Sequence, residues 1–175
     1  MRAIDYLTEN ITTLDFETTG FSAERDEIIQ VGAIKFRNGV EIARFDRYVK
    51  PQQPIPYRIT RLTGITDAMV YDAAPLAHTL IELYDFLKGE TIVAHNASFD
   101  LRFLRENFYR HGIQYDGYNV IDTVKVAKHS SLPVPNFKLE TLKHYLGINT
   151  TSHSAINDCM VTGSLYYHCR NLIII

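Results

Sequence analysis

The order of strand-like and helix-like segments predicts an α/β fold, a five-stranded mixed sheet with helices on its faces. Three β-rich runs come first, and the pair Asn38-Gly39, a strong hairpin signal, joins the second run to the third. A short buried strand, a helical segment, a fifth strand and further helical segments follow. The length of 175 residues is typical of one compact domain. We therefore expect a single domain over residues 1–175, with its motifs between about residues 10 and 170.

The N-terminal half is expected to form an antiparallel meander of three strands. The first strand, residues 11–16, is a short apolar run that ends at the turn signal Thr18-Thr19-Gly20. Residues 28–36 and 40–49 are rich in β-branched and aromatic side chains, which favour strands. Three prolines between residues 51 and 56 then predict an irregular stretch, because proline interrupts both strand ladders and helix interiors.

The C-terminal half alternates helical and strand patterns. Residues 75–87 show helical spacing of apolar side chains, and residues 91–94 form a short buried strand. The next helix, residues 99–109, stops at Gly112, and its apolar face consists of Phe99, Phe103, Leu104 and Phe108. Residues 120–121 mark a fifth strand. The remaining helical patterns cover residues 124–128, 139–146 and 154 to about 172.

Composition and charge limit the classes of function. The chain is 46% hydrophobic and 22% charged, close to the averages for soluble globular proteins. A net charge of −2 argues against a protein that coats nucleic acid with lysine and arginine, so any contact with nucleic acid is expected to be local. No apolar run approaches the ~20 residues that span a bilayer, and the first residues lack a secretory layout. We therefore expect a cytoplasmic protein without membrane contacts.

The sequence also predicts the state of the two cysteines and the packing of the apolar C-terminal end. Cys159 and Cys169 are ten residues apart in one helical segment, a separation of ~15 Å, which is too long for a disulfide. They are expected to be buried thiols. The end of the chain, residues 171–175, has two readings: a last helical turn packed on the core, or an edge that docks a partner.

The first stretch that could contribute to a functional site is Asp15-Phe16-Glu17, at the end of the first strand. Residues two apart on a strand point to the same face, so the two carboxylates can share a cation across ~6.6 Å. The alternative is a solvated acidic face on an amphipathic strand. The neighbouring Gly20 favours the metal interpretation, because glycine permits a tight turn that brings backbone amides close to a ligand.

The second stretch, residues 95–100, runs from a buried strand into the following helix. Asp100 is expected in the first turn of that helix. An aspartate there can simply complement the helix dipole. Its position beyond the end of a strand, where α/β sheets place their sites, favours a functional role.

The third stretch is His153-Ser154-Ala155-Ile156-Asn157-Asp158. On one helix, His153 and Asp158 would lie about 140° apart and face different sides. Both can face one site only if His153 precedes the helix, and Ser152 and Ser154 are candidate N-caps for a helix that begins there. The alternative is a histidine exposed in a loop without a function.

Together these stretches resemble the three ordered motifs of the DEDDh (DnaQ-like) superfamily of 3′→5′ exonucleases, over nearly the whole chain. Residues 59–67, which contain Leu-Thr-Gly-Ile-Thr, also resemble a loop of its proofreading branch, related to the epsilon subunit and the Gram-positive replicative polymerase of DNA polymerase III. A sister branch has tyrosine four residues before the last aspartate. Ser154 stands at that position here, and His153 stands five before, as in the histidine branch. The resemblance implies a ribonuclease-H-like fold.

The resemblance also implies a mechanism with two divalent metal ions, Mg²⁺ or Mn²⁺, bound by oxygen ligands. Asp15 would bridge both ions, Glu17 and Asp158 would complete the ion that activates water, and Asp100 would hold the other. Histidine side chains titrate near neutral pH, so a neutral His153 would be the general base that takes a proton from the attacking water.

The substrate implied by the resemblance is a single-stranded or frayed 3′ end of DNA, with a nucleoside monophosphate as product and a DNA polymerase as partner. Thr18 and Thr19 would hold the terminal nucleotide, while Leu62 and Ile65 would wedge against the bases. Two roles are equally compatible with Phe99: its ring could pack on the sugar or base, or it could fill the core. The other motif residues expected at the substrate are Phe16, Gly20, His95 and Asn96.

Three functions compete at this point. The first is a DNA exonuclease in proofreading or repair, the second is an exoribonuclease of the same fold, and the third is a binding or scaffold module without catalysis. The Leu-Thr-Gly-Ile-Thr loop favours the first over the second. Loss of an acid would have favoured the third, but all four acids and the histidine are present.

Overall fold

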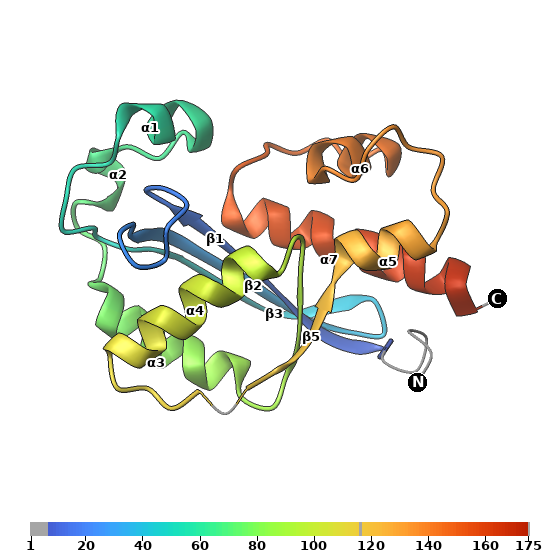
Figure 1. Ribbon diagram of the computed structural model, residues 1–175, viewed down its shortest axis with the longest axis horizontal. Coiled ribbons are helices and arrows are strands. Elements are labelled where there is room, and N and C mark those ends of the chain that lie inside the picture. The colour runs from blue at the N-terminus through green and yellow to red at the C-terminus, as the bar shows by residue number, and fades with distance from the viewer. Residues whose placement is uncertain (1–6, 116, 175) are drawn as a thin grey trace.

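The computed structural model describes residues 7–115 and 117–174. Within these residues five strands form one sheet in the order β3-β2-β1-β4-β5 (Figure 1). The strands are β1 Asn10–Thr18, β2 Ile28–Arg37, β3 Val40–Tyr48, β4 Thr91–Ala94 and β5 Asn119–Asp122. The first three pair antiparallel, whereas β4 pairs parallel with both β1 and β5. The expected meander and mixed sheet are therefore confirmed.

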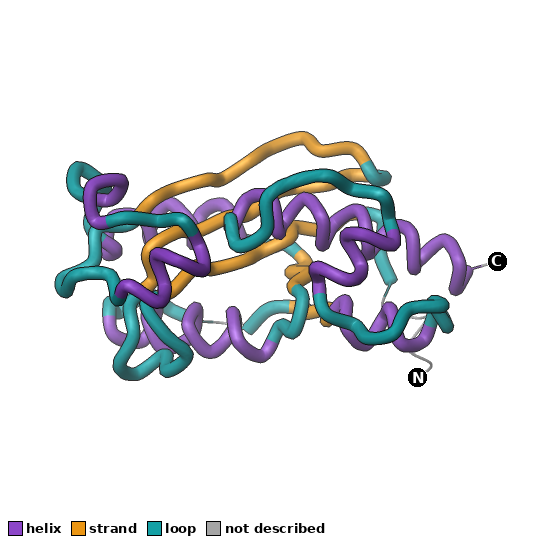
Figure 2. Tube along the Cα trace, turned by 90° about the horizontal axis from the view of Figure 1, so that it is seen from above, coloured by secondary structure: helices purple, strands orange, loops and turns teal. Residues whose placement is uncertain are grey.

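Helices cover both faces of the sheet (Figures 1 and 2). They are α1 Tyr57–Thr63, α2 Asp67–Val70, α3 Leu76–Leu87, α4 Ser98–Arg110, α5 Thr123–His129, α6 Leu139–Tyr145 and α7 Ala155–Ile174. Side chains alternate along β1 between two cores. Leu14 and Phe16 join a cluster with residues of α3 and α4, while Ile11 joins a cluster with residues of α5, α6 and α7. Asp15 and Glu17 have the same parity as Ile11, so they lie on the α7 side.

The main departure from the expected fold is the proline-rich region. The structure has α1 and α2 where we expected an irregular stretch. Pro56 immediately precedes α1, a position where proline is compatible with a helix, and Gly64 ends it in a left-handed conformation. A small core of its own, which includes Ile59, Ile65 and Val70, holds the two short helices against Ile29 of β2. Tertiary burial therefore outweighs the local proline signal.

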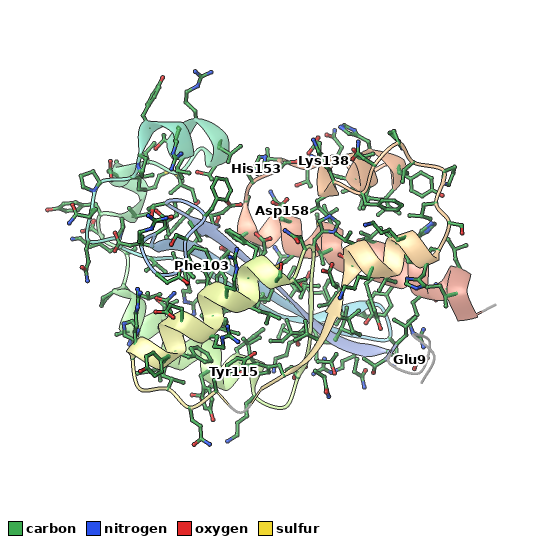
Figure 3. All side chains as sticks on the ribbon, viewed as in Figure 1. Glu9, Phe103, Tyr115, Lys138, His153 and Asp158 are labelled. Carbon is green, nitrogen blue, oxygen red and sulfur yellow. The ribbon has the colours of Figure 1, made fainter. Side chains whose placement is uncertain are left out.

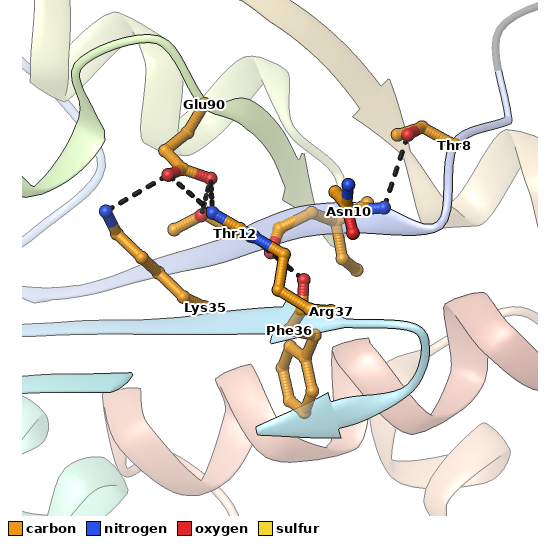
Figure 4. Close-up of polar contacts among 8 residues, drawn as sticks. Thr8, Asn10, Thr12, Lys35, Phe36, Arg37 and Glu90 are labelled. Atoms are coloured by element: carbon orange, nitrogen blue, oxygen red, sulfur yellow. Dashed lines mark hydrogen bonds and ion pairs between the residues drawn. The ribbon is translucent and has the colours of Figure 1, made fainter. Parts of the chain in front are cut away.

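A partly buried ion network fastens the end of the sheet that lies away from the acidic motif (Figure 4). The carboxylate of Glu90 accepts hydrogen bonds from Thr12 of β1 at 2.8 Å and from Arg37 of β2 at 2.7 Å, and pairs with Lys35 at 3.0 Å. Burial acts to raise the pKa of Glu90, but these hydrogen bonds and charges outweigh it and lower that pKa. The network joins β1, β2 and the turn that leads into β4.

The C-terminal helix is fixed to the start of β1. The hydroxyl of Tyr166 donates to the carbonyl oxygen of Thr8 at 2.7 Å, and Arg170 pairs with Glu9 at 3.1 Å. The helix continues to Ile174, with Ile173 packed on the second core, as the packed-turn reading of the C-terminal end predicts. Residue 175 lies outside the described residues.

Two further expectations concern the thiols and the membrane. Cys159 and Cys169 are buried and free, as expected. Among the described residues, no helix combines the length and the apolar character needed to cross a membrane.

Candidate active site

The acidic pair of the first motif lies next to an irregularity in the pairing of β1 with β2. Asp15 is opposite Gly32 and Glu17 is opposite Gln30, and the register then shifts between Glu17 and Thr18. The carboxyl group of Glu17 is buried, which is uncommon for glutamate. The two carboxylates thus lie on one side of the strand, under α7, as the strand period predicts.

Asp100 approaches the pair from the other side of β1. It lies in the first turn of α4, as expected, and only 2% of its surface is exposed. Its Oδ1 accepts a hydrogen bond of 3.0 Å from the main-chain N–H of Phe16. A buried carboxylate requires such a partner, and this one places Asp100 beside Asp15 and Glu17.

The start of α7 brings the last acid to the same place. A Cβ atom on Gly32 would lie 2.5 Å from the carbonyl carbon of Ala155, so this close approach of helix to strand requires glycine. The N–H of Ala155 donates to the side-chain oxygen of Gln30 at 3.1 Å, which satisfies one free donor of the helix terminus. Asp158, one turn further along, is buried on the sheet side.

His153 precedes α7, as the helix geometry requires (Figure 3). Its main-chain N–H donates to Oδ2 of Asp158 at 3.1 Å, and its φ angle is 59°, in the left-handed region. One ring nitrogen of His153 and one carboxylate oxygen each of Glu17 and Asp158 all lie within 4.8 Å of one another. The residue is exposed, so its imidazole borders the buried carboxylates from the solvent side.

Burial raises the pKa of all four carboxylates, and the charges of neighbouring carboxylates add to this effect. Burial and the charges of Asp100, Glu17 and Asp158 raise the pKa of Asp15 well above its usual range. Burial, with the charges of Asp158 and Asp100, raises the pKa of Glu17 to about 8. Burial raises the pKa of Asp100 to about 7, although the hydrogen bond from Phe16 acts in the opposite direction. Burial likewise raises the pKa of Asp158 to about 6. Such a cluster is stable only when it binds protons or cations.

The comparisons with known proteins agree with this geometry. The family model described as exonuclease matches residues 12–166. The chain belongs to the exonuclease family. The chain is 37% identical over 153 residues to a DNA polymerase III PolC-type protein of Caldanaerobacter subterraneus, and 37% identical over 158 residues to that of Bacillus cereus. The matches cover 87% and 90% of this chain but only 11% of each polymerase.

Solved structures show the same fold. An exonuclease X bound to duplex DNA with a 5′ overhang aligns with a TM-score of 0.70 at 23% identity, over 92% of this chain and 91% of that one. An exonuclease I structure aligns with a TM-score of 0.80 at 21% identity, over 95% of this chain and 43% of that one. These likenesses confirm the α/β architecture of the expected ribonuclease-H-like fold.

In this exonuclease-family chain the residues after the acidic pair form a closed loop. The hydroxyl of Thr18 donates to the carbonyl oxygen of Gly20 at 2.6 Å, and the hydroxyl of Thr19 accepts from the N–H of Glu27 at 2.9 Å. Both threonines are buried. Their contact with a terminal nucleotide stays a prediction, and the structure shows that their hydroxyl groups already hold the loop together.

The two residues of the expected wedge differ in exposure. Leu62 of α1 is 50% exposed, whereas Ile65 is 2% exposed and packs with Ile59 and Val70. Leu62 therefore faces solvent, and its contact with a base stays a prediction, whereas Ile65 packs in the small core that holds α1. Phe16 is also buried, in the main core, so its link to the site is through its main-chain N–H to Asp100.

His95 and Asn96 lie at the end of β4, close to the start of α4. Both ring nitrogens of His95 are occupied, Nδ1 with the hydroxyl of Thr123 at 2.8 Å and Nε2 with the carbonyl oxygen of Phe137 at 2.9 Å. Because a carbonyl oxygen only accepts, the ring donates from Nε2. The two hydrogen bonds join the end of β4 to the start of α5 and to the segment before α6. Asn96 is exposed with φ 60°, and its contact with substrate stays a prediction.

Two residues near the site were not predicted from the sequence, Phe21 and Asp122. Phe21 follows the Thr-Thr-Gly turn, is 72% exposed, and stacks edge-on with Phe99 at 6.4 Å between ring centres. Asp122 ends β5 and accepts from the N–H groups of Val124 at 2.9 Å and Asn96 at 3.2 Å. The signal for Asp122 was its place directly after a strand, the criterion that favoured Asp100.

Proposed function

We propose that this chain is a 3′→5′ exonuclease that hydrolyses the terminal phosphodiester bond of a DNA strand and releases a nucleoside monophosphate. The observation that carries the proposal is the convergence of four acids and one histidine from separate parts of the chain. Glu17, His153 and Asp158 offer ligand atoms within 4.8 Å of one another, and Asp100 is bonded to β1 beside Asp15. Family membership adds independent support.

The donor set fits divalent cations. Four carboxylates with raised pKa values form a site where positive charge relieves repulsion, and oxygen ligands suit Mg²⁺ or Mn²⁺. Asp15, Glu17, Asp100 and Asp158 would hold the two ions. When bound, such ions lower the pKa of a water and neutralise charge on the transferring phosphate and the leaving oxygen.

The position of His153 supports a role as the general base. Its imidazole lies on the solvent side of Glu17 and Asp158, within 4.8 Å of one carboxylate oxygen of each. A water bound between the two carboxylates would lie next to this ring, which can accept a proton when neutral. The Asp158 carboxylate also accepts the main-chain N–H of His153, so the base and the carboxylate are held as one unit.

The surface next to the acids suits an unpaired strand end. Leu62 is half exposed, and Phe21 presents most of its ring while touching Phe99. Apolar and aromatic side chains stack on any base, so they favour a nuclease without sequence preference. The PolC-type relatives are DNA polymerases, and we propose that this chain acts in proofreading or repair beside a polymerase.

The test is a time course on 5′-labelled single-stranded DNA and matched RNA, with Mg²⁺, Mn²⁺ or EDTA. We expect a metal-dependent ladder that shortens from the 3′ end, runs faster on DNA, and is at least ~10²-fold slower in Asp15→Ala and His153→Ala. Preference for RNA would replace DNA by RNA as the substrate. Absence of cleavage of both polymers, with Mn²⁺ bound, would overturn the proposal.

A further inference from the structure

Lys143 of α6 is buried, which is unusual for a lysine. Only 5% of the residue is exposed, so its ammonium group needs partners to replace water. Nζ donates to the carbonyl oxygen of Thr150 at 2.9 Å and to the hydroxyl of Ser152, and it pairs with Glu140 at 3.0 Å. The three partners match the three donors of an ammonium group.

Two of these partners belong to the segment that carries His153. Residues 146–154 connect α6 to α7, and the same segment is held from the α7 side, where Nδ2 of Asn157 donates to the Thr151 hydroxyl at 2.8 Å. Ser152 also donates to Glu140. The connection is therefore fixed at positions 150, 151 and 152, directly before His153.

The conformation of His153 depends on such support. A non-glycine residue with φ 59° lies in the left-handed region, which is strained for a residue with a Cβ atom, and this conformation persists only where the surroundings impose it. We propose that Lys143 is a positioning residue: by holding Thr150 and Ser152 it keeps His153 in this conformation, with its ring beside Glu17 and Asp158. The inference rests on the proposed function, since it matters for rate only if His153 accepts a proton.

The kinetic test is a double-mutant cycle between Lys143→Met and His153→Ala. Lys143→Met keeps the length and apolar stem of the side chain and removes the ammonium. We expect kcat on single-stranded DNA to fall about tenfold or more with little change in KM, because small displacements of a catalytic group cost rate. In the His153→Ala background the same substitution should leave kcat unchanged. An equal loss in both backgrounds, or no loss in either, would overturn the inference.

Lys125→Met is the matched control, since Lys125 is an exposed lysine of α5. It should change kcat less than twofold. If Lys143→Met does not fold, Ser152→Ala removes one partner of the ammonium and should lower kcat in the same cycle by a smaller factor; no effect there would count against the role of Lys143.

A second readout does not depend on cleavage. The ring resonances of His153, identified by their loss in His153→Ala, report where the imidazole lies. We expect them to shift and broaden in Lys143→Met while those of His78, on α3, stay unchanged. Because this measurement works without substrate, an inactive wild-type chain would overturn the proposed function and leave the positioning inference to be decided by the spectra. Unchanged His153 resonances would overturn the positioning role.

Discussion

The main-chain N–H of Phe16 donates a hydrogen bond of 3.0 Å to the carboxylate of Asp100, 84 residues further along the chain. The bond joins the first turn of α4 to β1 between Asp15 and Glu17. The separation of the two acidic motifs is therefore set by a direct contact and does not depend on the loops between them. Asp100 is in turn the largest source of repulsion on Asp15.

Replacing Asp15 by asparagine should separate activity from stability. The substitution removes an ionisable carboxyl group whose ionisation is opposed by burial and by its acidic neighbours, so metal-free protein at pH 8 should melt roughly 2–8 °C higher than wild type. Nuclease activity should fall at least ~10²-fold, because an expected metal ligand is lost. Thermal unfolding and the labelled-DNA assay measure both effects. Asp85→Asn, an exposed acid on α3, is the control, and a lower melting temperature for Asp15→Asn would contradict the repulsion argument.

The metal-free protein should lose stability as pH rises. The folded pKa of Glu17 is about 8 against 4.5 in its usual range, and that of Asp158 is about 6 against 3.8. Between these values the folded state binds more protons than the unfolded state, so stability falls as pH rises through roughly 4 to 8. We expect the melting temperature in EDTA to drop by roughly 5–10 °C from pH 5 to pH 8.

Added Mg²⁺ or Mn²⁺ should reverse this loss, and more so at pH 8 than at pH 5, because cations compete with protons for the carboxylates. Melting curves at both pH values, with metal and with EDTA, give the comparison. A metal effect of equal size at both values would show that the four carboxylates are not the binding site.

Substituting His153 by alanine should lower kcat by ~10²–10⁴ and leave the melting temperature nearly unchanged, since the side chain is exposed. In wild type at saturating Mn²⁺, kcat should rise from pH 5.5 to 8.5, because a protonated imidazole cannot accept a proton. His78→Ala, an exposed histidine of α3, should keep both rate and profile. A flat wild-type profile over this range would remove the histidine from the mechanism.

Leu62→Ala should weaken substrate binding, whereas Ile65→Ala should lower the stability of the fold. Leu62 is half exposed, so its loss should raise KM for single-stranded DNA several-fold without changing the melting temperature. Ile65 is buried in the small core under α1, and its truncation should cost ~2–4 kcal/mol of unfolding free energy. Steady-state kinetics and chemical denaturation distinguish the two outcomes. Equal stability of both variants would show that α1 is not supported by this core.

Gly32→Ala should disturb the site through the helix that covers it. The added Cβ would lie 2.5 Å from the Ala155 carbonyl carbon, so the start of α7 must move, at a cost of roughly 1–3 kcal/mol and with a lower kcat. Gly163→Ala is a matched control: its Cβ would meet the ring of Phe36 at 2.6 Å, further along α7. Gly163→Ala should lower the stability of the fold and leave kcat unchanged. If both variants lower kcat equally, the site does not depend specifically on the contact between Gly32 and the start of α7.

Local periodicity was enough to predict most of the frame of the site. The strand period placed Asp15 and Glu17 on one side of β1, and the helical period required His153 to precede α7, where the structure has it. The place of Asp100 in the first turn of α4 followed from its position after β4. These predictions succeeded because they depend on neighbours within a few residues.

The residue types and their order were thus determined by the sequence, including the four acids, the histidine and the family resemblance. Only the tertiary structure decided that α1 forms behind three prolines, that Leu62 faces outward while Ile65 is buried, and that Lys143 holds the segment before His153. Each of these depends on contacts between segments that come together only on folding. Burial against a distant element can outweigh local preference. The spacing of residues along the chain does not identify which distant element will supply that burial.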